Sequence, residues 1–185
     1  MNWPNRLTIL RIALIPVLVL CLYIDTGWAR VLALVVFLAA SFTDWLDGWM
    51  ARKYGIVTNF GKFLDPVADK LLVLSTLIAL CGRGVFPAWA CIVILFRELA
   101  VDGLRLVAME QGRIIAAGKL GKLKTTVQML TIVVFLLACG GVNVPLYLPE
   151  VMMWLTIALT IWSGADYFVK NRQALAGGGR LDHDA

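Results

Sequence analysis

The sequence has few charged residues and only one histidine. Asp, Glu, Lys and Arg make up 16% of its 185 residues, against about 25% in soluble globular domains, so an ordinary soluble domain is excluded. His183 lies in a Gly-rich tail, and we assign it no role. The four cysteines form no CxxC pair and no cluster with histidine, which excludes a thiolate or imidazole metal site.

A solvated basic domain is also missing. The chain has 17 Lys and Arg against 12 Asp and Glu, but nucleic-acid binding would require this excess on one solvated face or segment. We find no such segment and no internal repeat. Nucleic acid is therefore not an expected partner.

Long apolar runs dominate what is present, because 61% of the residues are hydrophobic. Crossing a bilayer as a helix takes about 20 mostly apolar residues, and such runs are too long and continuous for barrel strands. We predict an all-α polytopic membrane protein with a single six-helix domain over residues 1–173 and a flexible cytoplasmic tail over 174–185. The predicted transmembrane helices are 7–25, 30–51, 64–82, 86–108, 121–140 and 148–169.

The basic residues predict the orientation of these helices. Only Arg30 and Arg83 of the 17 Lys and Arg fall on one predicted side. Because cytoplasmic loops carry the excess of Lys and Arg, both termini are expected in the cytoplasm. Cys81 and Cys139 would then lie near the outer face. A disulfide between them is one alternative, and apolar free thiols are the favoured one.

Four aspartates interrupt this apolar pattern, in the stretch DWLDGWMARKYGIVTNFGKFLDPVAD at residues 44–69. Asp44 and Asp47 are three residues apart, and Asp65 and Asp69 are four apart, so each pair occupies one helical face. The segment between them must reverse the chain. Since residues equally far from the turn of a helix hairpin lie at equal depth, we predict that the four carboxylates converge near the cytoplasmic ends of two helices.

Four clustered carboxylates need protons or cations to neutralise them. Carboxylate oxygens alone select hard divalent ions, first Mg²⁺ or Mn²⁺, and four of them suit the pair of ions found at many phosphoryl-transfer sites. The alternative is a solvated hairpin whose acids pair with nearby basic residues. That alternative does not predict a facing set of four acids.

The spacing Asp44-x2-Asp47-Gly48-x2-Ala51-Arg52-x8-Gly61-x3-Asp65-x3-Asp69 resembles the signature of the CDP-alcohol phosphotransferase family. The resemblance covers the whole chain. It implies a bacterial inner-membrane enzyme, commonly a homodimer, with a cytoplasmic active site. It also implies that the four aspartates hold two divalent metal ions and that Asp69 is the general base.

The resemblance assigns the remaining site residues. Flanking stretches such as GKFLDPVADKLLV and FRELAVDGLRL resemble the members that transfer the phosphatidyl group of CDP-diacylglycerol to sn-glycerol 3-phosphate, releasing CMP. The expected CDP-diacylglycerol contacts are Asn5, Thr8, Gly48, Ala51, Arg52, Thr58 and Gly61. The cations expected to bind the acceptor's phosphate are Arg97, Arg105, Lys122 and Lys124.

Two alternatives to this function remain open at the sequence level. Another member of the family with a different acceptor, such as phosphatidylglycerol or inositol phosphate, would share the aspartates. A divalent-cation transporter would also place acids in its helices. It should, however, show repeated broken helices with acids near the midplane, whereas all four signature acids fall in one hairpin.

Overall fold

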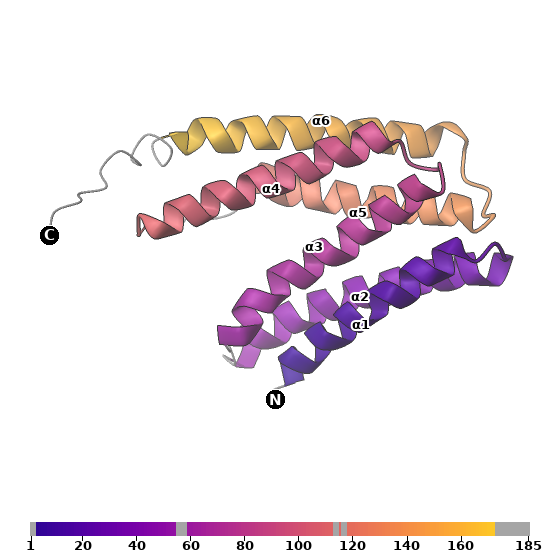
Figure 1. Ribbon diagram of the computed structural model, residues 1–185, viewed down its shortest axis with the longest axis horizontal. Helices are drawn as coiled ribbons and strands as arrows, with labels where there is room; N and C mark the ends of the chain where they lie inside the picture. Colours follow the sequence, from indigo (N-terminus) through magenta and orange to yellow (C-terminus); the bar gives the residue numbers. More distant parts are fainter. Residues whose placement is uncertain (1–2, 55–58, 113–114, 116–117, 173–185) are drawn as a thin grey trace, which may run out of the picture. The chain divides into compact units, whose positions relative to one another are not determined.

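The computed structural model describes residues 3–54, 59–112, 115 and 118–172, leaving out the side chains of residues 3–6, 45, 47–54 and 59–63. These residues form helices and no strand (Figure 1). The six helices are α1 Trp3–Tyr23, α2 Gly27–Tyr54, α3 Asn59–Gly82, α4 Ala88–Glu110, α5 Lys119–Cys139 and α6 Tyr147–Lys170.

The predicted all-α, six-helix fold is confirmed, with each helix close to its predicted apolar run. The largest differences lie at the start of α1, at both ends of α2 and at the start of α3, and all but the start of α2 extend the helix into polar sequence. Backbone hydrogen bonds inside a helix do not require apolar side chains, so a helix can extend beyond the hydrocarbon region. The predicted tail at 174–185 lies outside the described residues.

Three described helical stretches are long and apolar enough to cross a membrane, namely Gly27–Asp44, Lys119–Cys139 and Tyr147–Lys170. The apolar part of α1, Leu7–Tyr23, is shorter, and α3 and α4 carry several charged residues within their apolar sequence. Charges inside a span are costly and mark functional positions. That all six helices cross the bilayer stays a prediction.

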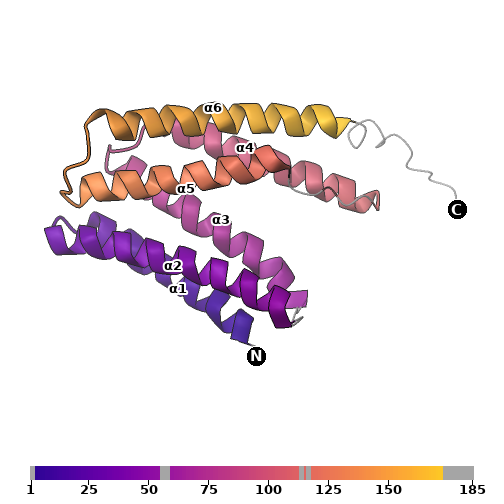
Figure 2. The ribbon, with the colours of Figure 1, turned by 180° about the vertical axis from the view of Figure 1, so that it is seen from behind.

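The chain divides into two compact units. Unit 1 comprises residues 1–88 and 132–149, and unit 2 comprises residues 89–131 and 150–185. In unit 1, α1 packs against both α2 and α3, as Figure 2 shows from behind. Leu18 and Leu22 of α1, Phe37 of α2 and Leu72 of α3 form part of its buried core. Helix α1 therefore reaches both helices that carry the aspartates.

In unit 2, α4 and α6 are joined by a buried cluster of Val101, Leu104, Ala108 and Tyr167. The first part of α5 contacts α6 through a buried pair of hydroxyls, Thr131 and Thr156, whose oxygens are 2.7 Å apart. The two hydroxyls thus hydrogen-bond to each other across the helices, as buried hydroxyls do in an apolar environment.

Large apolar side chains also cover the outside of the helices. Leu20 is 64% exposed, Val35 53%, Ile92 64% and Trp162 64%. Exposed apolar area on this scale is expected where lipid is the solvent. All four cysteines are free, so the favoured alternative of unpaired thiols is confirmed for Cys81 and Cys139.

Candidate active site

Helix α1 holds the first signature aspartate through a buried arginine. The Arg11 side chain is completely buried, and its Nη1 lies 2.8 Å from Oδ1 of Asp44 on α2. Burying a guanidinium is costly unless a counter-charge and hydrogen bonds accompany it. Asp44 supplies that charge, while its own side chain stays 40% exposed. The pair therefore anchors a carboxylate that remains partly accessible.

A second contact from α1 holds the third aspartate. Thr8 Oγ1 donates a hydrogen bond of 2.6 Å to Oδ1 of Asp65 on α3, and Thr8 is completely buried. Thr8 and Arg11 are three residues apart and so share one face of α1. That face brings Asp44 and Asp65 close enough for their charges to interact.

The full cluster of four aspartates stays a prediction. Asp69 lies one turn after Asp65 on α3 and is half-buried, whereas the side chain of Asp47 lies outside the described residues. Among the side chains that the structure describes, no three acids, histidines or cysteines form a metal-binding group. The structure thus brings two of the four predicted acids together, through contacts with α1.

Most of the predicted CDP-diacylglycerol contacts lie outside the described side chains. These are Asn5, Gly48, Ala51, Arg52, Thr58 and Gly61. Thr8 is described, and the structure places its hydroxyl on Asp65. A hydroxyl in this position orients a carboxylate, so Thr8 has a positioning contact in addition to its predicted nucleotide contact.

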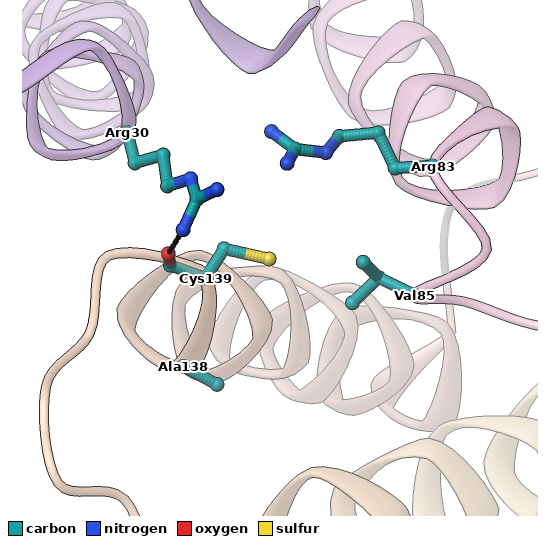
Figure 3. Close-up of a pocket in the computed structure, with 5 residues that line it drawn as sticks. All are labelled: Arg30, Arg83, Val85, Ala138 and Cys139. Carbon is teal, nitrogen blue, oxygen red and sulfur yellow. Dashed lines mark hydrogen bonds between the residues drawn. The ribbon is translucent and has the colours of Figure 1, made fainter. Parts of the chain in front are cut away.

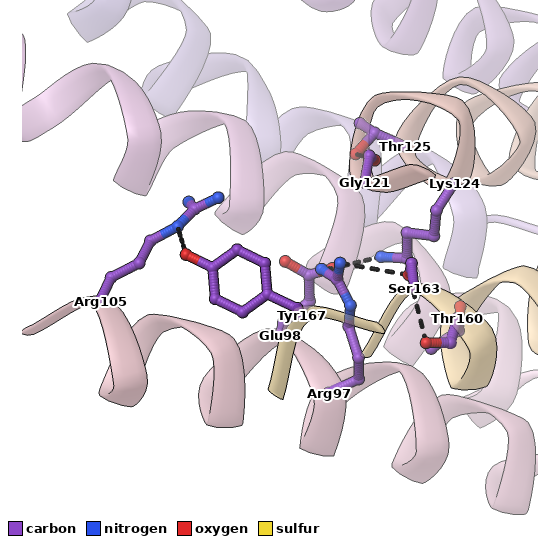
Figure 4. A network of polar contacts seen from close by, with 9 residues as sticks. All are labelled: Arg97, Glu98, Arg105, Gly121, Lys124, Thr125, Thr160, Ser163 and Tyr167. Carbon is purple, nitrogen blue, oxygen red and sulfur yellow. Dashed lines mark hydrogen bonds and ion pairs between the residues drawn. The ribbon is translucent and has the colours of Figure 1, made fainter. Parts of the chain in front are cut away.

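In unit 2, one carboxylate joins two of the predicted phosphate-binding cations (Figure 4). Oε1 of Glu98 accepts a hydrogen bond of 3.1 Å from Nη1 of Arg97 and another from Nζ of Lys124. The Lys124 side chain is 1% exposed, and those of Arg97 and Glu98 are 13% and 14% exposed. Three charges with a net charge of +1 are therefore held in a largely buried network.

Helix α6 contacts Arg97 and also Arg105, a further predicted phosphate-binding cation. Arg97 Nη2 donates to Ser163 Oγ at 3.2 Å, and Arg105 Nε donates to the Tyr167 hydroxyl at 3.0 Å. The Arg105 guanidinium also lies 5.5 Å from the centroid of the Tyr167 ring, within range of a cation–π interaction. These contacts restrict the side-chain conformations of both arginines.

Gly164 allows α6 to approach Arg97 closely. A Cβ at this position would lie 3.1 Å from Cγ of Arg97, closer than most packed carbon atoms. Glycine is common where membrane helices pack at such short range. The absence of a side chain therefore leaves room for Arg97 to reach Ser163.

The predicted set of cations divides in the structure. Arg97 and Lys124 meet at Glu98, and Arg105 lies two turns further along α4. Lys122 is exposed on α5. Residues two apart on a helix do not share a face, which explains why Lys124 is buried and Lys122 is not.

Sequence reasoning missed the contribution of α6, from Ser163, Gly164 and Tyr167. A signal was present, because the polar stretch SGADY interrupts an otherwise apolar helix. The partner of Asp166, which the sequence left open, is Lys170 one turn later, with Nζ and Oδ2 2.8 Å apart. This exposed pair is separate from the arginine network.

A family model and several known proteins are similar to this chain over most of its length. Residues 1–162 match the model of the CDP-alcohol phosphatidyltransferase family. A Bacillus subtilis protein named CDP-diacylglycerol–glycerol-3-phosphate 3-phosphatidyltransferase is 42% identical, covering 94% of this chain and 97% of its own.

Two further relatives extend the comparison. A Rickettsia bellii protein of the same name is 43% identical over 90% of this chain and 93% of its own. A Mycobacterium tuberculosis protein named probable phosphatidylglycerophosphate synthase is 42% identical over 95% of this chain and 84% of its own. The chain belongs to the CDP-alcohol phosphatidyltransferase family.

Proposed function

We propose that the protein transfers the phosphatidyl group of CDP-diacylglycerol to sn-glycerol 3-phosphate, forming phosphatidylglycerol phosphate and CMP. The names of the relatives support this reaction. The structural observation that carries it is the pairing of Asp44 with Arg11 and of Asp65 with Thr8. One face of α1 holds two signature carboxylates in place before any substrate binds, which is the preorganisation that phosphoryl transfer needs.

The donor chemistry of the acids fits divalent metal ions. Asp44 and Asp65 offer hard carboxylate oxygens from two different helices, as Mg²⁺ and Mn²⁺ prefer. We propose that they hold two such ions together with Asp47 and Asp69. Bound metal would neutralise the diphosphate and the departing CMP. Thr8 and Arg11 keep the two described carboxylates oriented, as supporting hydrogen bonds do at metal sites.

The Asp69 carboxylate is proposed as the general base. The hydroxyl of glycerol 3-phosphate attacks the phosphatidyl phosphorus, and the bond from that phosphorus to the CMP oxygen breaks. The hydroxyl proton passes to a carboxylate oxygen of Asp69. A base in this role must be within hydrogen-bond reach of the hydroxyl, and Asp69 lies one turn from the anchored Asp65.

The cations of unit 2 are proposed to bind the phosphate of the acceptor. Arg97 and Arg105 have guanidinium groups suited to bidentate phosphate binding, and their contacts with Ser163 and Tyr167 hold them in defined positions. Lys124 and Lys122 add positive charge. A phosphorylated acceptor suits this group better than an uncharged one does.

Location and assembly are proposed on the same basis. The apolar helices and the bacterial relatives support a membrane-bound enzyme. We propose the bacterial inner membrane, with both termini and the active site facing the cytoplasm, and a homodimer.

The nucleotide of CDP-diacylglycerol is proposed to contact Gly48, Ala51, Arg52, Thr58 and Gly61, with Asn5 and Thr8 from α1.

The test is CMP release by the purified protein in detergent. CDP-diacylglycerol and Mg²⁺ are supplied with glycerol 3-phosphate, inositol phosphate or phosphatidylglycerol in separate reactions. The expected result is CMP with glycerol 3-phosphate alone, lost when EDTA removes the metal and lost in Asp69→Asn. Asp166→Asn is a matched control, because Asp166 pairs with Lys170 outside the site, and it should retain activity.

Each contrary result identifies which part of the proposal fails. CMP release with inositol phosphate or phosphatidylglycerol instead would overturn the proposed acceptor and retain the aspartate site. Full activity of Asp69→Asn would overturn the assignment of the base. Activity unaffected by EDTA and restored by no added divalent ion would overturn the metal site.

A further inference from the structure

The far end of unit 1 contains a second group of charged residues that the proposed reaction does not use. Arg30 at the start of α2 and Arg83 just after α3 both contact Oδ1 of Asp25, which lies between α1 and α2. The hydrogen bond and charge of Arg30, with the charge of Arg83, hold the pKa of Asp25 below its usual value. Two cations thus share one carboxylate, leaving a net charge of +1.

The two arginines also contact backbone carbonyls at helix ends. Arg30 Nη1 donates to the Cys139 carbonyl of α5 at 3.4 Å, and Arg83 Nη1 donates to the Leu22 carbonyl of α1. A guanidinium has five N–H donors, and within the described residues two from each arginine are used. A third donor of Arg30, its Nε, is buried and has no hydrogen-bond partner among the residues that the structure describes.

A pocket of about 290 Å³ lies between these side chains. Its lining consists of Arg30, Arg83, Val85, Ala138 and Cys139, all from unit 1. Figure 3 shows the two guanidinium groups extending toward each other from opposite sides, with the Cys139 sulfur below them. The pocket is large enough for a phosphate group, and its polar lining is cationic.

The pocket lies beside the ends of two candidate membrane spans. The span Gly27–Asp44 begins three residues before Arg30, and the span Lys119–Cys139 ends at Cys139. Trp28 is exposed in the first turn of α2, and exposed tryptophans gather at the headgroup level of membranes. Along α2, Arg30 and Asp44 are separated by about 21 Å, because each helical residue adds a rise of about 1.5 Å.

We propose that this pocket binds a phosphate group at the membrane surface opposite the aspartate site. Arginine is suited to this ligand because its planar fork matches two phosphate oxygens. The group is supplied by an anionic lipid headgroup or by dissolved phosphate. Asp25 competes with it for the same two guanidinium groups, so its carboxylate weakens anion binding.

Cys139 provides a reporter of occupancy, because its sulfur lines the pocket and its thiol is free. The full-length protein is treated with N-ethylmaleimide, an uncharged reagent, and modification of Cys139 is followed by peptide mass spectrometry. One arm compares inorganic phosphate with chloride at equal ionic strength in neutral detergent. The other compares phosphatidylcholine nanodiscs with and without phosphatidic acid.

The expected result is several-fold slower modification of Cys139 in at least one arm. Slowing in the nanodisc arm alone assigns the pocket to a lipid headgroup, slowing in the phosphate arm alone assigns it to a dissolved anion, and slowing in both leaves it open to either. Arg30→Gln and Arg83→Gln should each raise the half-protecting anion concentration by about tenfold. Asp25→Asn should lower it, and Arg172→Gln, just after α6, should leave it unchanged.

Two results would overturn the proposal. One is equal modification rates with and without anion in both arms. The other is protection that persists unchanged in both arginine variants. CMP release by each variant confirms that it is folded, because the pocket is remote from the aspartates. Should an arginine variant lose activity, Asp25→Asn decides the question, since purely structural arginines would not bind anion more tightly after its substitution.

Discussion

The network around Glu98 gives the sharpest test of the site in unit 2. Replacing Glu98 with Gln keeps the shape of the side chain and removes its charge. Arg97 and Lys124 would then lose the carboxylate that they share. Because the Lys124 side chain is 1% exposed, water cannot replace that carboxylate without a change in packing.

The expected magnitude follows from this burial. Removing one partner from a buried ion pair costs about 3–5 kcal/mol, whereas an exposed pair contributes about 0–1 kcal/mol. The 14% exposure of Glu98 and 1% exposure of Lys124 place the pair in the buried class. We therefore expect Glu98→Gln to lower the free energy of unfolding by about 3 kcal/mol or more.

The assay is equilibrium unfolding in mixed micelles titrated with SDS. Glu110→Gln is the matched control, because Glu110 is an exposed acid on the same helix, and it should change the free energy of unfolding little. A double-mutant cycle with Lys124→Met measures the coupling directly, since removal of both charges should cost less than the sum of the single changes.

A loss below about 1 kcal/mol in Glu98→Gln, or additive single changes, would refute this reasoning. The pair would then behave as a solvated one. Glycerol 3-phosphate gives a second readout. If its phosphate binds Arg97 and Lys124, it should stabilise Glu98→Gln more than the parent protein, because it restores negative charge to the network.

Three further predictions test individual contacts. Thr8→Val removes the hydrogen bond to Asp65 and should raise the Mg²⁺ concentration needed for half-maximal CMP release by about tenfold; Thr8→Ser should restore it, and no change in Thr8→Val would contradict the positioning contact. Tyr167→Phe keeps the ring and removes the acceptor of Arg105, so KM for glycerol 3-phosphate should rise by about three- to tenfold with kcat little changed; a fall in kcat alone would contradict it. Asp25 has a folded pKa below its ordinary value of 3.8, so its contribution to stability is complete above about pH 3.8 and is lost as pH falls through the lowered pKa. Unfolding measured against pH should show a steeper acid limb in the parent than in Asp25→Asn, and parallel limbs would refute the linkage.

The sequence by itself determined the class of fold and the family. Helices in an apolar environment satisfy their backbone hydrogen bonds within one segment, so the six apolar runs were sufficient to predict six helices. The aspartate signature was likewise local, because its spacing of three and four residues is set by the helical repeat. Both features are readable along the chain without knowledge of which helices touch.

Only the tertiary structure decided which residues support the site. Thr8 and Asp65 are 57 residues apart, and Arg97 and Ser163 are 66 apart. Contacts of this kind depend on the rotation of each helix about its axis. In helices that are apolar on most faces, the pattern of side chains specifies that rotation weakly.

The same reason explains the division of the predicted cations. The sequence grouped Lys122 with Lys124 because both are basic and close together, whereas the structure exposes one and buries the other. Which of the two reaches Glu98 depends on the face that α5 turns toward α4. The sequence determined the chemical groups available to the site, and the packing of the helices decided which of them meet, because that packing brings side chains from distant segments within hydrogen-bond range.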